Sequence, residues 1–166
     1  MSLICDSFYV VLKSDEWKKN YPDNNSVSFR SKLLNEIDFK YDWEVALCDA
    51  QIFKPRGATI SHSVWIYCDI VAESQIGSRI EPLLRRVSAI NKISKLWVMV
   101  DFKNLEYVKV KQCNFDSIGI VIKEDADKHS QLLFSDQLQS EQEKIVSWKP
   151  SKSTATTLTL HFRKKK

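Results

Sequence analysis

The residues of this sequence that could carry acid–base or metal chemistry are its histidines, its cysteines and one acidic segment. That segment, KEDADKH at residues 123–129, places three carboxylates and a histidine within a short stretch. Calcium loops also need a glycine at the turn and further oxygen ligands, which this segment lacks. We therefore expect it to be the solvated end of a hairpin, and we predict no metal site there.

The remaining polar residues do not converge on a catalytic pattern. His62 stands between two serines and His161 lies in an alternating apolar run, where a packed or surface histidine is the simpler reading. The glycines Gly57, Gly77 and Gly119 are far apart, so no glycine-rich loop cradles a phosphate. We predict that the protein is not an enzyme and has no cofactor. A cupin-like metal enzyme would need clustered histidines and carboxylates.

Several features indicate the cellular setting. The cysteines form no C-x-x-C pair, which favours free thiols in a reducing compartment. The first residues, MSLICDSFYVV, carry no basic leader of a signal peptide. No stretch approaches the ~18 apolar residues of a membrane span. We expect a soluble intracellular protein that is not secreted and has no membrane partner.

The positive charge is concentrated at the end of the chain. The formal net charge is +4, and Lys164, Lys165 and Lys166 supply three of these charges. The rest of the chain is therefore nearly neutral. A basic tail of this kind is either a solvated end or a weak contact with nucleic acid or an acidic partner.

Alternation of apolar and polar residues predicts strands along most of the sequence. About eight segments have this pattern, at residues 8–12, 27–33, 43–53, 63–71, 96–102, 106–110, 117–123 and 156–163. Helical periodicity is weak. We predict an all-β fold with a single domain at residues 1–163, a polar insert loop at about 136–153 and a basic tail at 164–166. The strand count is compatible with a jelly-roll or an immunoglobulin-like sandwich.

Several predicted strands have bulky apolar residues on both faces, although a surface strand of a monomer needs only one. The residues on the second face are Tyr9, Val11, Trp65, Tyr67, Val71, Trp97 and Met99. Interfaces between subunits favour tyrosine, tryptophan, methionine and arginine. We therefore expect Trp65, Tyr67, Trp97 and Met99 at subunit contacts. The alternative is that loops or a short helix of the same chain cover this face.

The segment IEPLLRRVSAI at residues 80–90 also fits an interface. Pro82 is expected to end the preceding strand, which makes the segment a long connection between strands. Arg85 and Arg86 then form a paired cationic head, which can clamp a carboxylate across an interface. The alternative is a pair of solvated arginines.

Four motifs in this order resemble a known family: YPDN at 21–24, WEVAL at 43–47, YCDIV at 67–71 and PLLRRV at 82–87. Together they resemble the minor capsid, or penton, proteins of Maverick/Polinton-type elements and adintoviruses. The resemblance implies a single jelly roll and a homopentamer at the vertices of an icosahedral virion, held by the major capsid protein. It implies assembly, not catalysis, with the lysine tail able to face the genome.

The chain also departs from that family. Residues 136–153 add about twenty positions where relatives often have a short connection. A domesticated copy of the gene could have acquired a new role. The alternative function is a jelly-roll binding module that recognises glycans or a host receptor through its end loops.

Overall fold

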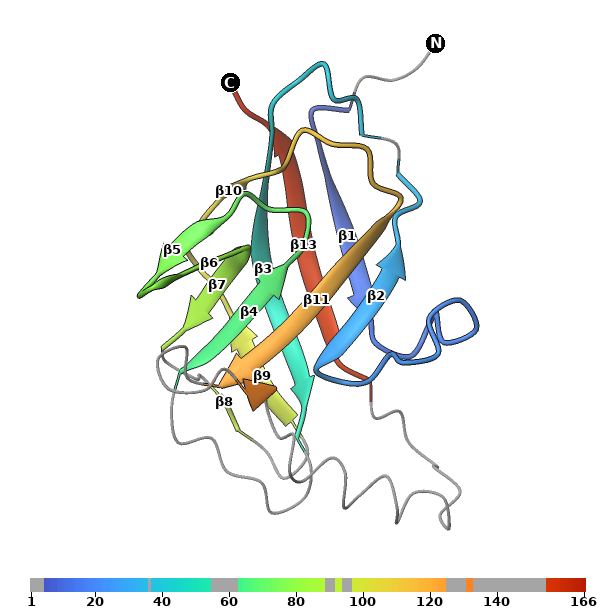
Figure 1. Ribbon diagram of the computed structural model, residues 1–166, viewed down its shortest axis with the longest axis vertical. Coiled ribbons are helices and arrows are strands. Elements are labelled where there is room, and N and C mark those ends of the chain that lie inside the picture. The colour runs from blue at the N-terminus through green and yellow to red at the C-terminus, as the bar shows by residue number, and fades with distance from the viewer. Residues whose placement is uncertain are drawn as a thin grey trace.

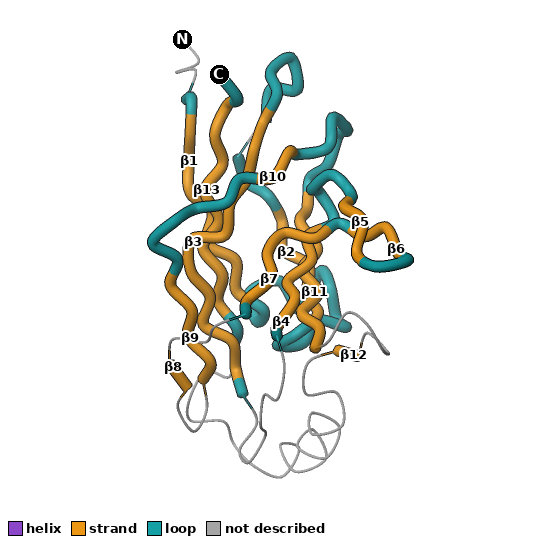
Figure 2. The backbone as a smooth tube through the Cα atoms, turned by 90° about the vertical axis from the view of Figure 1, so that its left-hand side faces the viewer, coloured by secondary structure: helices purple, strands orange, loops and turns teal. Residues whose placement is uncertain are grey.

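The computed structural model describes residues 5–35, 37–54, 63–88, 92–93, 97–124, 131–132 and 155–166 (Figure 1). These residues form strands and turns, and no helix occurs among them. Viewed edge-on, the strands lie in two layers (Figure 2). The predicted all-β sandwich is confirmed. His62, residues 125–129 of the acidic segment and the insert at 136–153 lie outside the described residues.

The larger sheet, sheet A, and the smaller sheet, sheet B, are both antiparallel. Sheet A has the order β1 (Ser7–Lys13), β13 (Thr157–Lys164), β3 (Trp43–Phe53), β9 (Trp97–Asp101), β8 (Lys92–Ile93), and β10 (Val108–Lys109) also pairs with β3. Sheet B has the order β12 (Gln131–Leu132), β11 (Ser117–Glu124), β4 (Val64–Cys68), β7 (Leu83–Val87), and β2 (Ser28–Lys32) also pairs with β11. β5 (Ser74–Ile76) and β6 (Arg79–Glu81) form a separate hairpin.

The eight longest described strands pair in a nested pattern. The first pairs with the last, β1 with β13, and the second with the seventh, β2 with β11. The third pairs with the sixth, β3 with β9, and the fourth with the fifth, β4 with β7. One long hairpin wrapped into two sheets gives this order. It is the pairing that a jelly roll requires, and it differs from the strand order of an immunoglobulin sandwich.

The core lies between the inner faces of the two sheets. β13 supplies Leu158, Leu160 and Phe162, which are fully buried, while the residues between them face outwards. β11 of sheet B supplies Ile118, Ile120 and Ile122 in the same alternation. Burying such a side chain stabilises the fold by about 1.5–3 kcal/mol. The period-2 pattern of the sequence therefore identified the inner face of both strands.

The segment after Gly77 is not the long connection that Pro82 led us to expect. β6 ends at Glu81 and β7 begins at Leu83, so Pro82 only separates two strands. β7 lies at the edge of sheet B, where a missing N–H is tolerated, and the register with β4 shifts between Ile66 and Tyr67. The Pro82 carbonyl still accepts a hydrogen bond from the Cys68 N–H at 3.0 Å.

The basic tail is shorter than predicted, because β13 continues through Lys164. The Lys164 ammonium lies 4.3 Å from the ring centroid of Tyr41 and 5.7 Å from that of Trp43. It also pairs with the Asp6 carboxylate at 3.3 Å, and its side chain is only 13% exposed. Lys164 therefore belongs to the domain. Lys165 and Lys166 lie beyond the strand with exposed side chains, although the Lys165 N–H still donates to the Asp42 carbonyl at 2.8 Å.

Candidate functional site

Two of the predicted contact residues, Trp65 and Arg86, lie opposite each other on β4 and β7. The Arg86 guanidinium carbon is 5.0 Å from the Trp65 ring centroid, within the range of a cation–π contact. Arg86 also donates a hydrogen bond from Nη2 to Ser63 Oγ at 3.1 Å. Arg86 is exposed and Trp65 is half-buried. They form an aromatic and cationic surface on the outer face of sheet B.

Tyr67 lies beside Trp65 on the second face of β4, but its own chain covers it. The side chain is 5% exposed and packs with Ile76 of the β5–β6 hairpin and with Leu83 and Val121. The hairpin projects from the sheet-B side of the sandwich (Figure 2). Tyr67 therefore needs no neighbouring subunit for its burial, which corrects its assignment as a contact residue. Val71, which alternation also assigned to this face, lies beyond the end of β4 and is buried in the core between the two sheets.

The hydroxyl group of Tyr67 is buried near charged side chains but makes no well-formed hydrogen bond among the described residues. Burial, followed by the neighbouring Glu81 carboxylate, raises the pKa of Tyr67 to about 12. The hydroxyl nevertheless has no partner with hydrogen-bond geometry among the described residues. Lys123 lies 4.9 Å from the Tyr67 ring centroid and pairs with Glu81 at 3.4 Å. The ring is thus fixed by packing and by charges around it.

Arg85 and Arg86 do not form a paired cationic head, because neighbouring residues of a strand point to opposite faces. The Arg85 side chain is 10% exposed and pairs with Glu106 at 3.2 Å. Its guanidinium carbon lies 4.0 Å from the Phe102 ring centroid, and Nη1 donates to the Asn104 carbonyl at 3.3 Å. Arg85 therefore packs against Phe102 and Glu106 of the same chain, and of the two arginines only Arg86 faces outwards.

Trp97 and Met99 lie on β9, on the outer face of sheet A, while Val98 and Val100 between and beside them enter the core. The Trp97 ring packs edge-on against Phe53, with 5.8 Å between the ring centroids. Both Trp97 and Met99 are half-buried. The predicted contact residues thus separate into two surfaces on opposite sides of the sandwich, Trp65–Arg86 and Trp97–Met99.

The most exposed apolar strand residues of sheet A are elsewhere, on β1. Tyr9 is 64% exposed and Val11 is 52% exposed. The Tyr9 ring stacks on His161 of β13, with 4.5 Å between centroids. Alternation placed both residues opposite the core, but it gave no sign that they would be more exposed than Trp65 or Trp97. We call Tyr9 and Val11 the β1 patch.

His161 is the one histidine within the described residues, and its ring stacks against Tyr9 of the β1 patch. Burial lowers the pKa of His161, and the nearby Arg163 guanidinium lowers it further. Its Nδ1 lies 2.7 Å from the Tyr107 hydroxyl. The Arg163 guanidinium carbon lies 3.4 Å from the Tyr107 ring centroid. His161 therefore has the role of a packed histidine.

A groove of about 470 Å³ lies on the outer face of sheet B, where Tyr21, Pro22, Tyr67 and Pro82 contribute to its lining. An ion pair between Arg30 and Asp69 also lines it. The arrangement combines aromatic surface with charged hydrogen-bonding groups, which suits a small polar ligand.

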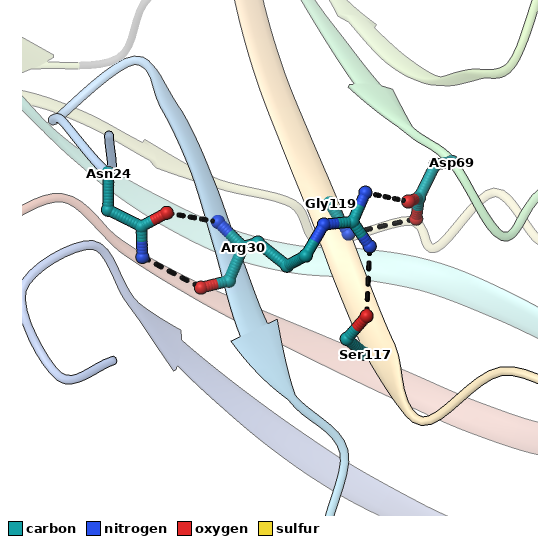
Figure 3. Close-up of polar contacts among 5 residues, drawn as sticks. All are labelled: Asn24, Arg30, Asp69, Ser117 and Gly119. Atoms are coloured by element: carbon teal, nitrogen blue, oxygen red, sulfur yellow. Dashed lines mark hydrogen bonds and ion pairs between the residues drawn. The ribbon is translucent and has the colours of Figure 1, made fainter. Parts of the chain in front are cut away.

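The ion pair belongs to a polar network that joins β2, β11 and the end of β4 (Figure 3). Arg30 Nη2 is 2.6 Å from Asp69 Oδ2, and Arg30 Nη1 donates to Ser117 Oγ at 2.9 Å. The Gly119 N–H donates to Asp69 Oδ1 at 2.8 Å. Asn24 exchanges two hydrogen bonds with the Arg30 backbone, both at 2.8 Å. Sequence reasoning missed this network, although a glycine inside a strand is a signal of close approach.

Comparison of the chain with protein-family models, with curated proteins and with solved structures finds no match. Within the described ranges, no three His, Cys, Asp or Glu side chains are grouped as metal ligands would be. The same ranges contain no helix with the length and apolar character of a membrane span.

Proposed function

We propose that this chain is a structural protein that assembles with copies of itself, as the penton subunit of an icosahedral capsid. The observation that carries the proposal is the pair of surfaces on opposite sides of the sandwich, Trp65–Arg86 on sheet B and Trp97–Met99 on sheet A. A ring arises when one head-to-tail contact is repeated and the rotation closes. Such a contact needs two different surfaces on each subunit.

The chemistry of the two surfaces supports a protein–protein contact. Tryptophan, methionine and arginine are the residue types enriched at interfaces. Among the described residues Arg86 contacts Trp65 and Ser63, and its side chain is exposed to a carboxylate or an aromatic ring of another subunit. The order of the four sequence motifs supports the more specific proposal of a pentamer at a capsid vertex.

The proposed partners follow from the same assignment. The major capsid protein would surround the rim of the pentamer in the virion. Lys165 and Lys166 are exposed beyond the end of β13 and would supply a weak contact with the genome. Lys164 is engaged with Asp6 and Tyr41, so its contribution to that contact is reduced.

The particle mass of the purified chain, together with negative-stain images, tests the proposal. Five-fold rings with five times the mass of the 19.3 kDa chain are expected. Addition of the major capsid protein is part of the experiment, because a ring can depend on that neighbour. A chain that stays monomeric both alone and with it contradicts the proposal.

The Arg30–Asp69 groove favours a second candidate, a binding module for a hydroxyl-rich ligand such as a glycan. Its paired donor and acceptor sit beside Tyr21 in an open groove. Screening of a glycan array with the wild-type chain and with Asp69→Asn tests this function. Sugar binding by a monomer, lost in the variant, would favour the binding module over the capsid subunit.

A further inference from the structure

Among the described strands, β1 is an edge strand of sheet A. It pairs with β13 on one side, and no described strand pairs with its other side. Its seven residues keep a continuous register with β13, and none of them is proline. Natural edge strands usually carry a proline, a bulge or an inward charge that prevents further pairing. The only charged residue of β1 is Lys13, at its end.

Two hydrogen bonds at the ends of the ladder fix which backbone groups of β1 face outwards. The Lys164 N–H donates to the Asp6 carbonyl at 2.9 Å, and the Ser14 N–H donates to the Thr156 carbonyl at 3.0 Å. Hydrogen-bonded and non-bonded pairs alternate along an antiparallel ladder. The even-numbered residues of β1 therefore bond to β13. The N–H and C=O groups of the odd-numbered residues point away from it.

The same odd-numbered residues carry the exposed apolar side chains. Tyr9 and Val11 form the β1 patch, at 64% and 52% exposure. Addition of a strand to a sheet edge uses both features, because the backbone groups supply affinity and the alternate side chains supply specificity. The edge of β1 therefore offers a complete site for an extended strand.

We infer that this site binds the β1 strand of a second copy, antiparallel, about a two-fold axis at Val10. The strand SFYVVLK is nearly symmetrical about that residue. Tyr9 then lies opposite Val11 of the second copy, an aromatic and β-branched pair that stabilises sheets. Lys13 lies opposite Ser7, so like charges do not meet. In this register the odd-numbered residues of the two β1 strands lie opposite each other, so the outward N–H groups of one strand meet the outward C=O groups of the other.

This contact goes beyond the proposed ring. It lies at the β1 edge of sheet A, whereas the proposed ring uses Trp65–Arg86 and Trp97–Met99 on the outer faces of the two sheets. A chain that makes only the β1 contact is a two-fold dimer. A chain that makes both contacts links one ring to another. The two proposals can therefore fail separately.

Amide hydrogen exchange of the full chain over a concentration series tests the backbone contact. We expect the Tyr9 and Val11 amides to become protected as concentration rises, in step with a larger sedimenting species. Protection that does not depend on concentration would mean that another segment of the same chain covers the edge, and it would overturn the inference. Absence of protection at the highest concentration would also overturn it. Five-fold rings with unprotected β1 amides would leave only the ring proposal standing.

A charge swap tests the register. Ser7→Lys places a lysine opposite Lys13 of the second copy, and we expect the dimer dissociation constant to rise roughly threefold to tenfold. Ser7→Lys combined with Lys13→Glu places opposite charges there and should restore the dimer. Val11→Pro removes an outward N–H without removing a bond to β13 and should abolish the dimer while the fold is retained. Association that is unchanged in Ser7→Lys and Val11→Pro would refute this contact.

Discussion

Arg30 and Asp69 meet across the backbone of Gly119, whose missing side chain leaves room for their ion pair. A Cβ at position 119 would lie 2.7 Å from Arg30 Nη2 and 2.8 Å from Asp69 Oδ2. Both distances are shorter than any ordinary contact, so no larger residue fits without moving the pair. Gly119 therefore lets a side chain from β2 and one from the end of β4 join over β11. This contact ties three neighbouring strands of sheet B together.

Gly119→Ala is expected to separate the ion pair and to alter the groove beside it. Arg30 can swing into solvent, so the loss of stability is limited to about 1 kcal/mol. In a chain of this size that corresponds to a fall in Tm of roughly 2–4 °C. Differential scanning calorimetry measures it, with Gly57→Ala, outside the described residues, as a comparison. A Gly119→Ala variant as stable as wild type would show that the pair adds nothing to the fold.

The network around Gly119 also marks what the sequence could not reveal. Alternation identified the strands and their inner faces, because burial of one face imposes a period of two. It could not identify partners that are distant in sequence, since Asp69 is 39 positions from Arg30 and 50 from Gly119. The nested strand order is likewise a property of pairing between distant segments. Local sequence patterns do not specify such pairing.

Two errors of sequence interpretation have local physical causes. Pro82 was expected to start a long connection, but an edge strand tolerates a residue without an N–H, so β7 begins immediately after it. Tyr67 was assigned to a subunit contact because its strand has two apolar faces. The β5–β6 hairpin, whose Gly77 has φ of 59°, folds back and covers it. Strand periodicity identifies an apolar face, but it does not tell what covers that face.

Arg86→Ala is expected to weaken ring assembly with little effect on folding. Arg86 is exposed, so the loss of its contact with Trp65 should change the free energy of unfolding by less than about 1 kcal/mol. Arg163→Ala is the control, because Arg163 is also exposed and lies over an aromatic ring, Tyr107, at the other end of β3 from the Trp97 contact. Arg163 also pairs with Glu44 at 3.1 Å, so the free energy of unfolding of both variants is measured beside their assembly. Sedimentation velocity measures the assembled fraction. An equal effect of both variants would remove Arg86 from the interface.

The stability of the fold is expected to fall as the pH drops through the titration of His161. The unfolded chain takes up this proton near pH ~6.5, whereas the folded chain takes it up at lower pH because its pKa is lowered by burial and by Arg163. Between these values the unfolded state binds more protons, so acid favours unfolding. Urea denaturation at pH 7.5 and pH 5.5 measures the loss. His161→Phe keeps a ring beside Tyr9 and should reduce the dependence; an unchanged dependence would assign it to other groups.

Tyr67→Phe is expected to leave the fold intact at neutral pH, because the hydroxyl that it removes lacks a partner with hydrogen-bond geometry among the described residues. The free energy of unfolding should stay equal or rise by about 1 kcal/mol, since a buried hydroxyl without a hydrogen bond is costly. The dependence of the free energy of unfolding on alkaline pH is the more specific test. The pKa of Tyr67 is about 12 in the folded chain. An unfolded tyrosine ionises near pH ~10.

Folding therefore favours the protonated form of Tyr67. The contribution of this pKa difference to the free energy of unfolding is complete below pH ~10 and is lost as the pH rises towards the pKa of the folded chain. Wild-type stability should fall over this window more steeply than that of Tyr67→Phe. Tyr41→Phe is the control, because Tyr41 is 42% exposed. Chemical denaturation at several alkaline pH values measures the stability of each variant, and ultraviolet titration follows the ionisation of the tyrosine hydroxyls. If stability falls with pH equally steeply in wild type and in Tyr67→Phe, the Tyr67 hydroxyl ionises as readily in the folded chain as in the unfolded one. That result would contradict its burial by the β5–β6 hairpin.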